Sequence, residues 1–193
     1  MKTFDEYVQM AEIAHGHICA GQILGLRMAV YGVQLLGLDD PAGKDRKRLV
    51  TFVEIDRCAT GAIAVVTGCR LGKRTLKFRD FGKVAATFCD LASRRAVRVA
   101  ARESSRERAR ELYPEIEDSN ERQMRAYREL TDQELFAHRW VEVRVPPEDL
   151  PGFKAPRVFC EACGEGINFK REVSRDGRTL CRACAGEAYY TVV

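Results

Sequence analysis

The segment HGHICAGQILGLRM, residues 15–28, places two of the chain's three histidines and one of its eight cysteines just before an apolar run. Gly21, Gly25 and Ala29 recur at four-residue spacing, which gives a helix one smooth face. We expect a helix from about Ile18 to Leu36, with another element packed closely against this face. The start of that helix then decides where the histidines and the cysteine lie.

Spacing alone leaves the role of these histidines and this cysteine open. His15 and Cys19 are four residues apart and share a face if the helix includes both. His17 and Cys19 are two residues apart and converge only at an irregular helix start. A metal site, a nucleophilic thiol with a histidine base and a buried small thiol all fit the spacing, and packing is the simplest of the three interpretations.

Helical and extended patterns alternate along the rest of the N-terminal part. Thr3 and Glu6 form a capping-box pair that opens a first helix. Residues 62–68 fit either a short helix or a strand. Strands are expected at 49–55, 75–80, 83–91, 96–102 and 138–145, and charged helices at about 104–112 and 119–130.

Prolines divide the 193-residue chain into two unequal domains. Four of the six prolines fall between 146 and 156, and proline favours extended linkers. We therefore expect a core domain at 1–146, a linker at 147–156 and a small domain at 157–193. A domain this short needs more than apolar burial to fold.

The small domain contains two cysteine pairs, Cys160-x2-Cys163 and Cys181-x2-Cys184, separated by seventeen residues. Asp176-Gly177 predicts a hairpin turn that folds the second pair back onto the first. Four thiolates satisfy tetrahedral Zn²⁺ and leave no position for a substrate. The pattern predicts a structural zinc finger that resembles a treble-clef or zinc-ribbon module.

Charge and composition narrow the classes of partner. The formal net charge of +4 is small, and residues 94–130 hold ten arginines against eight acids, which indicates a solvated, salt-bridged face. From Arg157 to Val193 there are six basic and five acidic side chains, to which a Zn(Cys)₄ centre adds about −2. This balance favours a protein partner for the finger and disfavours nucleic acid.

The chain shows no signal for export or for a membrane. Its N-terminal stretch carries acids where a signal peptide has a basic and then an apolar run. No stretch reaches the roughly 18 uncharged apolar residues of a spanning helix. We expect a cytoplasmic protein with no membrane contact, whose cysteines bind metal rather than form disulfides.

Several motifs in order resemble the formylmethanofuran dehydrogenase E-subunit family over most of the chain. They are HGHICAGQILGLRM, then VEIDRCATGAIAVVTGCRLGKRTLKFRDFGKVAATF, then the four-cysteine finger. The residues that carry the resemblance are His17, Cys19, Gly21, Gly25, Arg27, Met28, Glu54, Cys58, Thr67, Gly68, Cys69, Gly72, Lys73, Asp80, Gly82 and Lys83.

The resemblance implies a fold and a second metal site. The fold is α+β, with helices packed on a mixed β-sheet, similar to the catalytic-domain fold of glyceraldehyde-3-phosphate dehydrogenases. The metal ligands it implies are His17, Cys19 and Cys58, with His15 and Cys69 in reserve. Such a nitrogen and sulfur set suits zinc, and three protein ligands leave one position open.

The chain also departs from the family pattern. Gly61 and Ala64 stand where many members have an aspartate and a glutamine, which puts a catalytic role in doubt. Cys89 and His138 are interpreted as ordinary packing residues.

Three functions remain. The first is a metal-binding protein resembling the accessory E subunit of tungsten or molybdenum formylmethanofuran dehydrogenase, and the resemblance also favours a homodimer. The second is a stand-alone zinc enzyme with Glu54 or Asp56 as general base. The third is a regulatory adaptor that binds protein partners through the finger, with a small-molecule ligand at the core. Whether the chain is an enzyme stays open.

Overall fold

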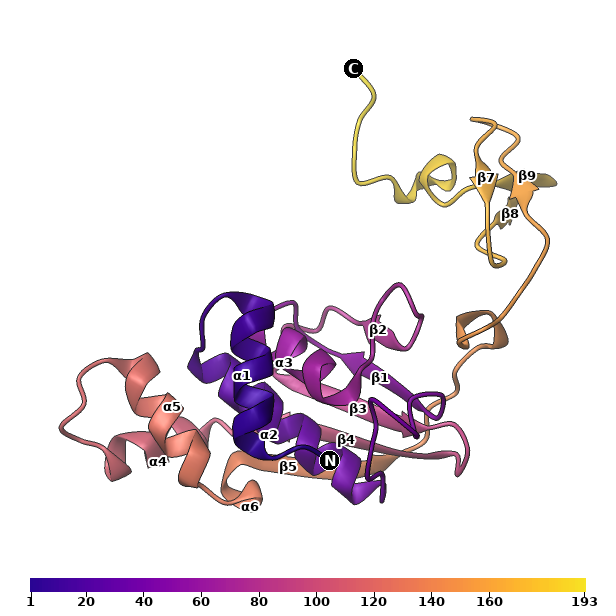
Figure 1. Cartoon of the computed structure of the whole chain (residues 1–193). Helices are drawn as coiled ribbons and strands as arrows, with labels where there is room; N and C mark the ends of the chain where they lie inside the picture. The colour runs from indigo at the N-terminus through magenta and orange to yellow at the C-terminus, as the bar shows by residue number, and fades with distance from the viewer. The chain divides into compact units, whose positions relative to one another are not determined.

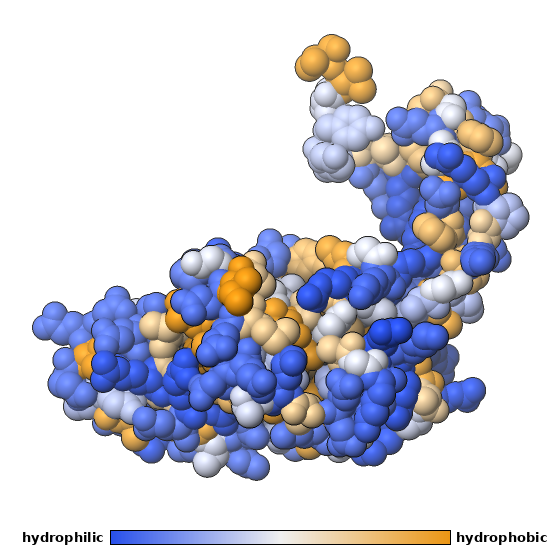
Figure 2. Space-filling model, viewed as in Figure 1, coloured by the Kyte–Doolittle hydropathy of each residue, from blue (hydrophilic) through white to orange (hydrophobic).

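The computed structural model describes all 193 residues, which divide into two compact units, Met1–Arg144 and Val145–Val193. Figure 1 shows the helices and strands of each unit. Hydrophilic side chains dominate the surface seen in Figure 2, as expected for a chain with 31% charged residues. No helix combines the length and the apolar character needed to span a membrane.

The first unit begins with two helices, α1 (Phe4–His15) and α2 (Ala20–Leu35). The predicted capping box is present, because the Glu6 amide donates to Thr3 Oγ1 at 3.3 Å and the Thr3 amide donates to Glu6 Oε2 at 2.7 Å. The second helix begins later than the expected Ile18, because Cys19 is its N-cap, with extended backbone at φ −144° and ψ 166°. Cys19 is therefore at the helix start and not inside the helix.

A five-stranded mixed sheet forms the centre of this unit, in the order β2-β1-β3-β4-β5. Strands β1 and β2 are parallel and the other neighbours are antiparallel, which confirms the predicted α+β class with a mixed sheet. The expected strand at 138–145 instead covers Phe136–Val141. The strands are β1 (Leu49–Val53), β2 (Leu76–Phe78), β3 (Ala85–Asp90), β4 (Arg95–Ala101) and β5 (Phe136–Val141).

The ambiguous apolar stretch at 62–68 belongs to a helix, α3 (Cys58–Thr67). Helices α1, α2 and α3 lie on one face of the sheet (Figure 1), and α2 packs directly along α3. At Gly25 the contact is so close that a Cβ would lie 2.5 Å from the Ala59 carbonyl oxygen and 2.7 Å from its Cα. The prediction that another element packs against the smooth face of α2 is confirmed, and that element is α3.

Three further helices follow the sheet strand β4, and one arginine ties them to α2. Arg27 Nη1 donates to the Tyr127 carbonyl at 2.8 Å, and Nη2 donates to the Leu130 carbonyl at 2.8 Å and to Asp132 Oδ1 at 2.9 Å. Arg27 thus satisfies carbonyls at the end of a helix that have no partner within it. The helices are α4 (Ser104–Leu112), α5 (Ser119–Glu129) and α6 (Asp132–Leu135).

The outer surface of these helices carries the ion pairs predicted from the arginine-rich segment. Arg125 contacts Glu121 at 2.7 Å, and Arg108 pairs with Glu111. Their side chains are about half exposed, so each pair contributes little to stability. Most of this charge keeps the helices solvated.

The second unit has very little apolar core. Its buried hydrophobic residues are Cys160, Ile167 and Leu180. Asp176 and Gly177 have positive φ values of 52° and 73° and make the predicted hairpin turn. The elements are two short hairpins, β6 (Val158–Phe159) with β7 (Gly166–Ile167) and β8 (Val173–Arg175) with β9 (Arg178–Leu180), and two helical turns, Pro147–Asp149 and Ala183–Glu187.

The contact at Gly25 predicts a large difference between two glycine substitutions in neighbouring helices. Gly25→Ala forces a methyl group into the α3 backbone and should lower the free energy of unfolding by about 1–3 kcal/mol. Gly61→Ala, where a Cβ meets nothing within 4 Å, should raise it by about 0.5–1 kcal/mol through helix propensity. Urea unfolding followed by circular dichroism measures both, and equal stability of the two variants would contradict the close contact.

Candidate metal centres

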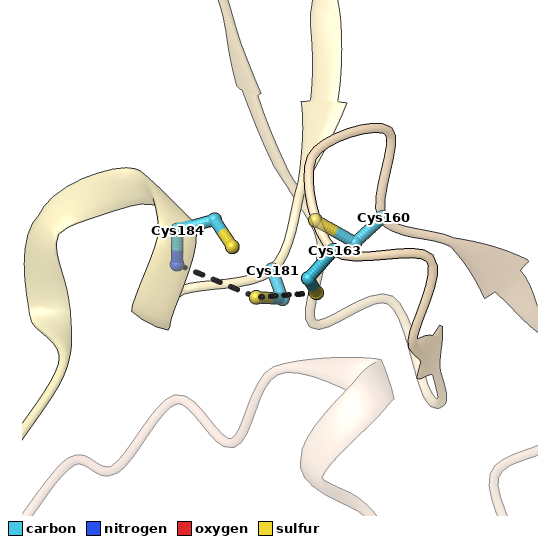
Figure 3. A group of neighbouring side chains, drawn as sticks. All are labelled: Cys160, Cys163, Cys181 and Cys184. Carbon is cyan, nitrogen blue, oxygen red and sulfur yellow. Dashed lines mark hydrogen bonds between the residues drawn. The ribbon is translucent and has the colours of Figure 1, made fainter. Parts of the chain in front are cut away.

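Four cysteines gather in the second unit, as Figure 3 shows. Their sulfur atoms all lie within 4.8 Å of one another, and Cys163 and Cys181 Sγ are 4.0 Å apart. Tetrahedral zinc with Zn–S bonds of about 2.3 Å separates its sulfurs by about 3.8 Å. The four thiols therefore fit zinc with little adjustment.

The backbone around this cluster prepares it for anionic sulfur. Amides from Cys181 and Cys163 lower the pKa of Cys160 to about 6. The neighbouring thiols of Cys181, Cys163 and Cys160 raise the pKa of Cys184 to about 12, because four thiolates repel one another. A divalent cation removes that repulsion, so ion binding and proton release are coupled at this site.

The second group of candidate ligands lies between α1 and α2. His15 is the last residue of α1, and Gly16 then adopts a left-handed conformation at φ 89°, which turns the chain back. The ligand atoms of His15, His17 and Cys19 lie within 4.8 Å of one another, and the two imidazole rings have centroids 4.8 Å apart. The segment is therefore an irregular helix start at which all three side chains converge.

Cys58 joins this group from the first position of α3. A Cβ on Gly21 would lie 3.4 Å from Cys58 Cβ and 3.9 Å from Cys19 Sγ, so the two cysteines flank the same glycine. Partial burial and the hydrogen bond with Cys19 raise the pKa of the Cys58 thiol. The structure thus brings His17, Cys19 and Cys58 to one end of the α2–α3 contact and adds His15.

Other residues singled out from the sequence have different roles. Cys69 is 2% exposed and lies 3.5 Å from Thr51 Oγ1, within the core. Glu54 accepts two hydrogen bonds of 2.6 Å from Arg98, so the proposed general base is held in a buried ion pair and the prediction of a free carboxylate there is wrong. Asp56 is exposed.

The two departures from the family pattern leave no defect in the fold. Gly61 faces open space, and Ala64 packs at the edge of the apolar core. Cys89, predicted to be a packing residue, is 5% exposed. His138, also predicted to be a packing residue, forms a 2.8 Å hydrogen bond with the Tyr31 hydroxyl.

A cavity of about 410 Å³ adjoins the second group of ligands. Cys19 and Cys58 form part of its wall, and the apolar part includes Leu24, Val84 and Tyr127. Sequence reasoning missed its polar lining, which comes from three separate segments that no local motif connects. These polar residues are Arg57, Arg102, Glu103, Ser105, Arg106, Ser119, Asn120 and Gln123.

The four-cysteine cluster leads to a prediction about domain stability. Cys181→Ser should remove about one zinc ion per chain and unfold the second unit, because its three buried apolar residues cannot stabilise it alone. Cys89→Ala removes a buried thiol elsewhere and should leave the zinc content unchanged. Elemental analysis with limited proteolysis distinguishes the two, and a protease-resistant second unit in zinc-free Cys181→Ser would contradict the structural role.

Comparisons with known proteins agree with this arrangement of two domains. A family model described as "FmdE, Molybdenum formylmethanofuran dehydrogenase operon" matches residues 14–139. A second, described as "Prokaryotic dksA/traR C4-type zinc finger", matches residues 155–190. The four-cysteine zinc finger predicted from spacing is thereby confirmed.

Two individual proteins are also similar to this chain. The crystal structure of an FmdE-like protein of tungsten formylmethanofuran dehydrogenase, from Syntrophus aciditrophicus, has the same fold, with a TM-score of 0.67, 21% identity and coverage of 98% of this chain and 96% of that one. A probable S-adenosyl-L-methionine-binding protein of Archaeoglobus fulgidus is 34% identical over 206 residues. The match covers 93% of this chain and 52% of that protein, so the chain spans about half the length of this relative. The predicted family resemblance is confirmed: the chain belongs to the FmdE family and carries a C4-type zinc finger after its FmdE domain.

Proposed function

We propose that the FmdE domain is a metal-binding module that holds a transition-metal ion, zinc first, through His17, Cys19 and Cys58. The observation that carries this proposal is the convergence of His15, His17 and Cys19 at the start of α2, with the Cys58 thiol beside Cys19. These residues come from two helix starts and are partly exposed, so an ion can reach them. His15 is placed to supply a further ligand.

The donor set supports zinc and an accessible site. Imidazole nitrogen and thiolate sulfur are ligands that zinc prefers, and three protein ligands leave a coordination position for another molecule. When bound, zinc would supply a Lewis acid at the wall of the cavity. The second unit differs, since its four cysteines complete a closed structural site.

The residues around the cavity support binding more than hydrolysis. Glu54 is held by Arg98, and the one carboxylate in the cavity wall, Glu103, has a side chain that is 81% exposed. Neither is a buried carboxylate positioned to take a proton from water. We therefore favour a binding role, with the stand-alone zinc enzyme as the alternative.

Finer expectations from the resemblance belong to the same proposal. They are an accessory role beside a tungsten or molybdenum formylmethanofuran dehydrogenase, a homodimer, a core similar to glyceraldehyde-3-phosphate dehydrogenase catalytic domains, and a cytoplasmic location. The nearly balanced charge of the finger supports a protein partner there, as in the adaptor hypothesis, over nucleic acid.

The proposed core site predicts the metal content of matched cysteine variants. Wild type should bind about two zinc ions per chain, and Cys19→Ser or Cys58→Ser should bind about one, because each removes a thiolate from the core site alone. Cys69→Ala, which deletes a buried thiol remote from the cavity, should keep both.

Native mass spectrometry with elemental analysis measures these stoichiometries, and circular dichroism verifies folding. One ion per chain in wild type and in all three variants would overturn the core site. Loss of an ion in Cys69→Ala alone would move the site to that cysteine.

A second candidate function is binding of S-adenosyl-L-methionine, which the name of the Archaeoglobus fulgidus relative favours. The cavity of about 410 Å³ lies within the range of small-molecule sites, and it combines apolar walls with polar groups. Ala101→Trp, at the cavity wall, should abolish saturable heat in a calorimetric titration with S-adenosyl-L-methionine. Ala92→Trp, on an exposed turn, should not. Wild-type protein that gives no saturable heat would remove this candidate.

A further inference from the structure

The wall of the cavity beside Cys19 and Cys58 carries an excess of cationic side chains. Three arginines, Arg57, Arg102 and Arg106, line it, and Glu103 is its one acidic residue. Glu103 contacts Arg106 at 3.5 Å, but both side chains are more than half exposed, so water screens the pair. The cavity therefore keeps a positive balance.

Two of the arginines are free to bind something other than the protein's own acids. Arg57 caps the start of α3 and forms no ion pair or side-chain hydrogen bond. Arg102 Nε donates to the Phe136 carbonyl at 2.9 Å, which fixes the side chain while its terminal nitrogens keep their donors. Fixed guanidinium groups suit carboxylate and phosphate, which accept two parallel hydrogen bonds.

Neutral side chains in the wall also present donors. Asn120 Oδ1 accepts from the Ala20 amide at 2.8 Å, and Gln123 Oε1 accepts from the Tyr127 hydroxyl at 3.2 Å. With both carbonyl oxygens engaged, the remaining groups of these two amides are NH₂ donors. Donors thus outnumber acceptors around the cavity.

The metal does not account for this positive charge. Zn²⁺ with two thiolates and a histidine is formally neutral, so the core site needs no cationic counter-charge. The arginines are therefore available to complement an anionic molecule in the cavity itself.

We propose that this cavity binds a small molecule through an oxyanion group, a carboxylate or a phosphate, held by Arg57, Arg102 and Arg106 beside the proposed metal. The inference deepens the proposed function and rests on it, because it names the class of molecule that the core site receives. Its basis is the meeting of three cations around one cavity, although they come from separate elements, the start of α3, the end of β4 and the first turn of α4.

Equilibrium dialysis of the zinc-loaded full chain with labelled inorganic phosphate, and separately with succinate, tests the proposal at constant ionic strength. Wild type should bind about one phosphate or one succinate per chain, saturably, and preference between them identifies the oxyanion. Arg57→Gln and Arg102→Gln should each weaken binding about tenfold through loss of a charged hydrogen bond. Arg110→Gln, which removes the same charge from α4 outside the cavity, should bind as wild type.

Absence of saturable binding of both probes to wild type would overturn the inference, as would equal losses in Arg110→Gln and Arg57→Gln. The zinc content of every dialysed sample separates this outcome from failure of the metal site. An arginine variant that keeps its zinc and loses phosphate supports the oxyanion site, whereas a wild type that binds oxyanion with only one zinc overturns the metal site alone.

Discussion

The close contact between α2 and α3 is the constraint on which the rest of the core depends. At Gly21 and Gly25 the second helix has no side chains, so the first turn of α3 lies directly against it, with Ala59 seated at Gly25. Because both helices begin at the same end of this contact, Cys19 and Cys58 meet there although they are distant in sequence. A side chain at either glycine would separate the cysteines as well as the helices.

The two metal centres differ in what surrounds them. The finger's four cysteines lie in a unit with almost no apolar core, so ion binding and folding are one event there. The core site lies on an independently packed domain whose fold does not require an ion. It opens on a cavity with arginine and amide donors, which gives it a partner for the ligand that a structural site lacks. This contrast supports binding as the role of the FmdE domain and scaffolding as the role of zinc in the finger.

Local features of the structure could be predicted from the sequence, and features that depend on tertiary contacts could not. The finger, the Thr3–Glu6 capping box and the Asp176-Gly177 turn each involve residues close in sequence. Residues 62–68 stayed ambiguous because a short buried apolar run fits helix and strand equally. The ligand Cys58 came only from the family resemblance, since nothing in its own segment indicates Cys19 as a neighbour. Glu54 looked like a free base because its pairing with Arg98 depends on sheet register. The cavity arginines were hidden in a segment whose other arginines are ordinary surface ion pairs.

Anomalous diffraction at the zinc edge from crystals of the zinc-loaded chain tests the central claim most directly. The account predicts two peaks per chain, one within the four cysteines of the finger and one bonded to Cys19 and Cys58 Sγ at about 2.3 Å, with His17 as a further ligand. A single peak at the finger, with Cys19 and Cys58 free of metal, would contradict it.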